Sequence, residues 1–305
     1  MSQPLLLMGV VILICIVMNR FIQRLAVPSL LIFIALGMLF GENGLFRIPF
    51  DDYQVSSIIC SVSLIFIMFY GGFGTNLSAA RPVLAKSILL STVGVALTAG
   101  LCGLFVHLVL GLSLYESLLI GAVISSTDAA SVFNILRTNR LSLKYGSASL
   151  LEIESGSNDP VSYMLTVILV SLLAGESVSV PLMLLSQVAI GILCGVVIGK
   201  LAVLLLSRLT FSDEHGKTIL VFAVVLVSYA LPDCLGGNGY LSAYLCGILM
   251  GNASIAHKRQ LIHFFDVMTD ISQVIIFFLL GLLVTPVELP AVFVPALCIM
   301  VFLTL

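Results

Sequence analysis

The chain has 305 residues, of which 60% are apolar and only 9% are charged, and its formal net charge is −2. Soluble domains are about 25% charged, so these charges are too few to cover the surface of a water-soluble protein. The composition excludes a soluble enzyme, a secreted disulfide-stabilised protein and a nucleic-acid-binding protein. About 20 apolar residues span a bilayer as a helix, and we interpret the chain as an all-α polytopic membrane protein.

We predict eleven transmembrane spans from the apolar runs of the sequence. They lie at residues 4–19, 28–41, 54–74, 86–111, 115–137, 147–174, 181–207, 217–233, 239–252, 261–284 and 290–305. The second and the ninth are short for a bilayer, so we expect tilt, interruption or local membrane thinning there. On span 7, Gly191, Gly195 and Gly199 form a stripe that favours close helix packing, either within the subunit or at a dimer contact.

The basic residues alternate along these spans. Twelve of the thirteen Lys and Arg residues lie in the loops that lead from odd-numbered to even-numbered spans, and the other loops contain only Arg47. Cytoplasmic loops are enriched in Lys and Arg, so we predict an N-terminus outside. The loop that contains Arg137, Arg140 and Lys144 is then cytoplasmic. The last residues, PALCIMVFLTL, stop inside an apolar run, and we expect the chain to be a piece of a longer protein.

Spans 5 and 6 contain most of the acidic residues that fall inside the predicted membrane. Ionisable groups there are costly and usually functional. Asp159 lies about 12 residues, or about 18 Å, from the start of its span, and Asp128 lies a similar distance from the opposite end of its own. Because the two spans run antiparallel, both carboxylates are expected at the bilayer centre. The acids well inside spans are Asp128, Glu152, Glu154, Asp159 and Asp270.

The spacing of the polar residues predicts a site rich in oxygen atoms. The Ser-Ser-Thr-Asp run at 125–128 competes with the helix backbone for hydrogen bonds, so we expect a locally unwound stretch with exposed carbonyls. On span 6, Ser155 with Asp159 and Glu154 with Asn158 are i,i+4 neighbours. Such oxygens suit a small monovalent cation. The alternative is that these groups bond only to one another and join two helices.

A carboxylate at this depth predicts ion exchange. Desolvation favours its neutral, protonated form and a bound cation favours its charged form, so proton and cation compete for it. If the site crosses the membrane only when Asp159 is neutralised, a cation carried one way obliges a proton to return. Alternating access around a midplane site with broken helices is a recurring transporter design.

Two motifs carry a resemblance to a known family. STDAASVFNIL followed by LEIESGSNDP resembles the monovalent cation:proton antiporter-1 family of NhaP-type exchangers, and the serine-rich second motif is most similar to the bacterial potassium/proton antiporters called cell volume regulation protein A. The resemblance implies an inverted-repeat fold with broken helices at the midplane, with residues 1–305 as an exchanger transmembrane domain incomplete at its C-terminus. It also implies a homodimer in the plasma membrane that exchanges K⁺ or Na⁺ for H⁺ and serves cation, pH and cell-volume homeostasis, without a cofactor.

The resemblance assigns roles to individual residues. Asp159 would be the carboxylate that exchanges proton for cation, and Asn158 matches the asparagine that marks electroneutral members of the family. Glu154 matches a glutamate that stabilises the core of the fold by pairing with an arginine, and that arginine is not found in this sequence. The residues that would complete cation coordination beside Asp159 are Thr127, Asp128 and Ser155.

Other classes of membrane protein remain as alternatives. A cation channel could use the same polar cluster, although no span carries a polar stripe along its whole length. A proton-translocating subunit of a larger complex usually has lysines within its spans, where this chain offers only Lys200. A structural anchor gives no reason for a central acid cluster, and an intramembrane enzyme would need a base that span 6 lacks.

Overall fold

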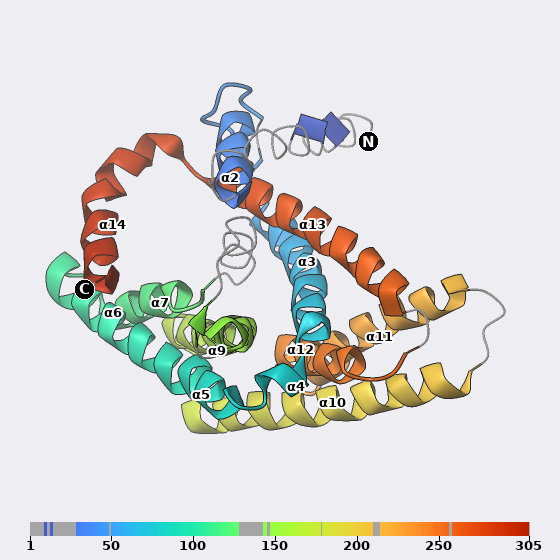
Figure 1. Ribbon diagram of the computed structural model, residues 1–305. Coiled ribbons are helices and arrows are strands. Elements are labelled where there is room, and N and C mark those ends of the chain that lie inside the picture. Colours follow the sequence, from blue (N-terminus) through green and yellow to red (C-terminus); the bar gives the residue numbers. More distant parts are fainter. Residues whose placement is uncertain are drawn as a thin grey trace. The chain divides into compact units, whose positions relative to one another are not determined.

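The computed structural model describes residues 9–10, 13–14, 29–48, 50–127, 143–144, 147–177, 179–209, 214–255 and 258–304. Within these residues the regular structure is entirely helical (Figure 1). The expected all-α class is therefore confirmed. The described residues belong to two compact units, Met1–Ile67 with His263–Val294 and Met68–Ile262 with Pro295–Leu305.

Most predicted spans from 28–41 onwards coincide with a helix. Six helical segments are long and apolar enough to cross a membrane, and three shorter apolar helices accompany them. The helices run α2 (Ser29–Phe40), α3 (Tyr53–Gly74), α4 (Leu77–Ala80), α5 (Leu84–Leu89), η1 (Leu90–Gly94), α6 (Val95–Leu110), α7 (Leu114–Ile124), α9 (Ser147–Leu173), α10 (Val180–Arg208), α11 (Glu214–Cys234), α12 (Gly239–Gly251), α13 (Lys258–Leu283), η3 (Pro286–Glu288) and α14 (Leu289–Thr304). The predicted span at 4–19 lies almost wholly outside the described residues.

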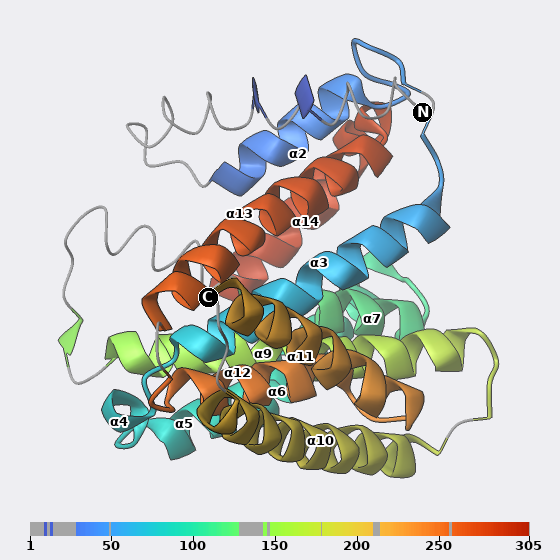
Figure 2. The ribbon, with the colours of Figure 1, turned by 90° about the vertical axis from the view of Figure 1, so that its right-hand side faces the viewer.

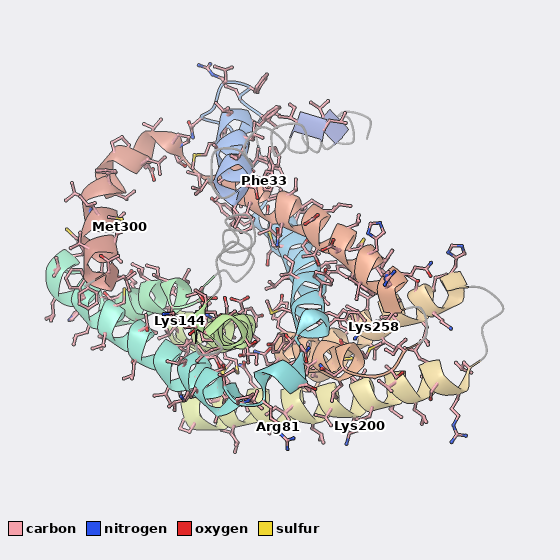
Figure 3. The ribbon with its side chains drawn as sticks, in the orientation of Figure 1. Phe33, Arg81, Lys144, Lys200, Lys258 and Met300 are labelled. Carbon is pink, nitrogen blue, oxygen red and sulfur yellow. The ribbon has the colours of Figure 1, made fainter. Side chains whose placement is uncertain are left out.

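The first unit contains α2 and most of α13, which pack closely. Its apolar core is formed by Phe33, Phe40, Phe278 and Leu282, and Phe33 is labelled on α2 in Figure 3. The two backbones approach at Gly37, where a Cβ atom would overlap α13. As expected for span 2, α2 has only 12 residues.

The second unit contains the helices around α9. Helix α5, the π-helical turn η1 and α6 form one continuous segment, Leu84–Leu110, and both α5 and η1 pack against α9. Helices α6 and α7 lie side by side, as do α10 and α12 (Figure 2). Arg81 and Lys200 of this unit, both labelled in Figure 3, are exposed.

The glycine stripe on α10 faces α12. A Cβ added to Gly195 would lie 2.7 Å from the Ser242 carbonyl oxygen, and one added to Gly199 would lie 2.9 Å from the Leu249 side chain. A larger residue would push the two backbones apart. The stripe therefore packs two helices within the subunit, which is the first of the two alternatives given by the sequence.

Candidate functional site

Helix α7 ends in the middle of the predicted span 115–137. It begins with a capping box, in which Ser113 and Glu116 each bond the other's backbone, and its last helical residue is Ile124. The Ser125 N–H still donates to the Gly121 carbonyl at 3.0 Å, and the Ser125 hydroxyl donates to the next carbonyl, that of Ala122, at 2.7 Å. Residues 125–127 are non-helical, so unwinding is confirmed there. Residues 128–142 lie outside the described residues.

Helix α9 supplies the other half of the site. It has 27 residues, with Pro160 inside it, and Asp159 lies 12 residues after its first residue and 14 before its last. At 1.5 Å per residue these are about 18 Å and 21 Å, so Asp159 lies midway along the helix. Ser162 Oγ donates to the Ala122 carbonyl at 2.6 Å, which fixes α9 against the end of α7 beside the site.

The structure brings the end of α7 and the middle of α9 together through three polar side chains and one backbone carbonyl. Ser155 Oγ donates to the Thr127 carbonyl at 2.6 Å, and the Thr127 and Ser155 hydroxyls lie 3.0 Å apart. Asn158 Nδ2 donates to Thr127 Oγ1 at 2.7 Å. Because the single hydroxyl hydrogen of Ser155 goes to the carbonyl, the Thr127 hydroxyl is the donor in this pair when its own hydrogen is not directed at Glu154 Oε2, 3.5 Å away.

Asp159 is held by Ser126, which was not among the residues predicted for the site. Ser126 Oγ donates to Asp159 Oδ1 and lies 3.4 Å from Asn158 Oδ1. Ser126 stands in the predicted Ser-Ser-Thr-Asp run, but its partner depends on how α7 meets α9. In the sequence, the feature that could have pointed to Ser126 as a site residue is its position next to Thr127.

Burial differs across the site. Asn158 is fully buried and Ser155 is 4% exposed, whereas Ser126 and Asp159 are partly buried and Thr127 is exposed. Oxygen atoms from both elements therefore lie next to a carboxylate that is partly accessible. Carbonyl, hydroxyl, amide and carboxylate oxygens are ligands for hard cations.

The remaining predicted site residues stand as follows. Glu154 Oε1 accepts from Asn158 Nδ2 at 3.3 Å, and Glu154 Oε2 lies 3.5 Å from Thr127 Oγ1, so Glu154 lies at the edge of the same cluster. Asp128 lies outside the described residues. The arrangement places oxygen atoms of the kinds that bind hard cations around Asp159, and its hydrogen bonds join the end of α7 to α9.

Comparison with known proteins gives the chain its family. Residues 9–305 match the family described as sodium/hydrogen exchanger, transmembrane. The chain is 40% identical over 301 residues to the K⁺/H⁺ antiporter NhaP of Alkalimonas amylolytica, covering 98% of this chain and 52% of that protein. It is 39% identical over 282 residues to the K⁺/H⁺ antiporter NhaP2 of Shewanella sp. (strain ANA-3), covering 91% and 49%. The chain spans about half the length of these curated relatives.

A solved structure supports the fold independently. The sodium proton antiporter MjNhaP1 from Methanocaldococcus jannaschii, solved at pH 8, matches with a TM-score of 0.83 and 22% sequence identity. The match covers 98% of this chain and 74% of that one. The chain therefore shares the fold of that structure.

Proposed function

The chain belongs to the transmembrane sodium/hydrogen exchanger family, and on that premise we propose that it forms the ion-binding part of a secondary antiporter. The protein exchanges a monovalent cation for H⁺ across the membrane by alternating access. K⁺ is the first candidate cation, since the relatives at 40% and 39% identity are named K⁺/H⁺ antiporters, and Na⁺ is the second. The exchange serves cation, pH and cell-volume homeostasis.

One observation carries this proposal. Asp159 lies midway along a membrane-length helix, partly accessible, with the Ser126 hydroxyl bonded to its carboxylate and the Thr127–Ser155 oxygens on the neighbouring turn. A cation that enters among these oxygens is paired by the Asp159 charge, while a proton neutralises the same carboxylate. The two ions are therefore alternatives at one group.

The residue next to Asp159 supports a proposal for the stoichiometry. Asn158, the neighbour of Asp159, is a neutral amide whose nitrogen is already used by Thr127 and Glu154. It therefore adds no second titrating carboxylate beside Asp159. One cation in exchange for one proton leaves the net charge moved at zero, and we propose electroneutral exchange.

The protein is a multi-pass membrane protein of an exchanger family. We place it in the plasma membrane as a homodimer, with the N-terminus outside and the loop that contains Arg137, Arg140 and Lys144 in the cytoplasm. The alternation of basic residues between loops supports this orientation.

Proton flux in everted vesicles tests the proposal. The product of the complete gene is expressed in a strain without its own exchangers, and dequenching of a pH-sensitive dye is followed after K⁺, Na⁺ or Li⁺ is added. Asp159→Asn should abolish the response to every cation. Ser157→Ala is the matched control, because among the described residues the Ser157 hydroxyl bonds within its own helix, to the Ile153 carbonyl, and this variant should respond as the wild type does.

Two results would overturn the proposal. A cation-dependent proton flux that survives Asp159→Asn would mean that another group exchanges the ions. Single-channel currents far above the turnover of a transporter would assign the protein to the channels.

A further inference from the structure

Helix α12 contacts α9 through a buried asparagine beside the site. Asn238 is 2% exposed, and its Nδ2 donates to the Pro160 carbonyl oxygen at 3.2 Å. Pro160 directly follows Asp159, so this bond holds the backbone one residue beyond the proposed ion-binding residue. The two bonded residues are 78 positions apart in the sequence.

The orientation of Asn238 is fixed by two further bonds. Its Oδ1 accepts the Leu241 N–H at 2.8 Å, which caps the start of α12. Its backbone N–H donates to the Gln187 carbonyl of α10 at 3.0 Å. With the oxygen committed to the cap, the amide nitrogen is turned toward α9.

The turn of α9 that Asn238 contacts lacks one of its backbone hydrogen bonds. Pro160 has no N–H, so it cannot make the helical bond to the Gly156 carbonyl. At this end of the turn, α12 approaches again: a Cβ atom added to Gly156 would lie 2.9 Å from the Tyr244 ring and hydroxyl. Asn158 and Asp159 therefore lie in a turn that α12 contacts at both ends.

We propose that Asn238 is a positioning residue for ion exchange, whose amide holds the Pro160 carbonyl and thereby fixes the direction of the Asp159 side chain toward Ser126. The proposal rests on the proposed antiport function. A helix turn with a missing backbone bond can bend, and a bend here would move the carboxylate relative to the Thr127 oxygens. The role is distinct from capping α12, since the cap uses the oxygen of the amide and the positioning uses its nitrogen.

Substitution of Asn238 separates the two roles. Asn238→Ser keeps an oxygen that can cap α12 but lacks the amide nitrogen. Asn238→Asp keeps the shape and the capping oxygen, and its carboxylate cannot donate to Pro160. Asn252→Ser is the matched control, because Asn252 ends the same helix and bonds backbone groups far from Asp159, the Thr75 carbonyl at 2.8 Å and the Leu77 N–H at 2.9 Å.

The measurements are the apparent KM for K⁺ and the pH profile of exchange in everted vesicles, with circular dichroism melting of the purified proteins alongside. Loss of one hydrogen bond of this kind corresponds to about a 3- to 10-fold change in an equilibrium constant. We expect both Asn238 variants to raise the apparent KM by about that factor and to shift the pH profile. Asn252→Ser should lower the melting temperature while leaving KM and the pH profile unchanged.

The outcomes separate this inference from the function itself. If the wild type shows no exchange, the proposed function fails. If the wild type exchanges and both Asn238 variants keep its KM and pH profile, Asn238 is only a cap and the inference is wrong. If either variant is too unstable for transport assays, carbodiimide labelling of Asp159 replaces those assays. The labelling is measured by peptide mass spectrometry. The K⁺ concentration that protects Asp159 must then rise in the surviving variant, and an unchanged value overturns the inference.

Discussion

Replacement of Asn158 by alanine tests whether the polar cluster supports the fold as well as the ion site. Asn158 is fully buried. Its amide nitrogen donates to Thr127 Oγ1 at 2.7 Å and to Glu154 Oε1 at 3.3 Å. Asn158→Ala removes both bonds, together with the weaker contact of Asn158 Oδ1 with the Ser126 hydroxyl at 3.4 Å, and leaves a small space between the end of α7 and α9.

The magnitude follows from the two acceptors. A hydrogen bond between neutral groups contributes about 0.5–1.5 kcal/mol, and one to a charged group contributes about 1.5–3 kcal/mol. Thr127 is exposed and Glu154 is partly buried, so water can replace part of what is lost. We therefore expect the free energy of unfolding to fall by about 2–4 kcal/mol, which lowers the melting temperature by at least about 4 °C.

The assay is thermal unfolding of the purified protein in detergent, followed by circular dichroism because the chain contains no Trp. Ser157→Ala is the control, since it removes a hydroxyl from the adjacent residue whose bond stays within α9. That variant should melt close to the wild type. Equal melting temperatures for Asn158→Ala and Ser157→Ala would refute the reasoning, because Asn158 would then contribute nothing across the two helices.

Two further predictions concern helix packing and capping. Gly72→Ala places a Cβ against the Tyr244 carbonyl and should lower the free energy of unfolding by about 1–3 kcal/mol. Gly71→Ala is the control, because a Cβ there meets open space, and it should be neutral or stabilising. Equal melting temperatures for the two variants would contradict the close packing at Gly72. Ser113→Ala removes the capping box with Glu116 and should destabilise the start of α7 by about 0.5–2 kcal/mol. The measurement is amide hydrogen exchange in the first turn of α7, which should become faster. Unchanged exchange there would show that the cap is not needed.

The local features of the site followed from the sequence. The serines and threonine at 125–127 predicted a break, because their hydroxyls compete with the backbone, and α7 does end at Ile124. The i,i+4 spacing of Ser155 and Asp159 put them on one face of a helix. These predictions succeeded because hydroxyl competition and helical spacing depend only on residues within a turn or two of each other. The part assigned to Asp128 stays a prediction.

The tertiary structure alone decided which helices meet. The tertiary contacts include the bond of Asn238 to Pro160, the contact of the Gly195 region with α12 and the bond of Ser126 to Asp159, and each joins a helix to another helix or to the residue at its end. In a membrane, lipid tails are as apolar as the helix surfaces, so hydrophobicity does not select one helix as the neighbour of another. Close backbone approach and polar bonds make that selection, and these contacts form only once the helices are packed.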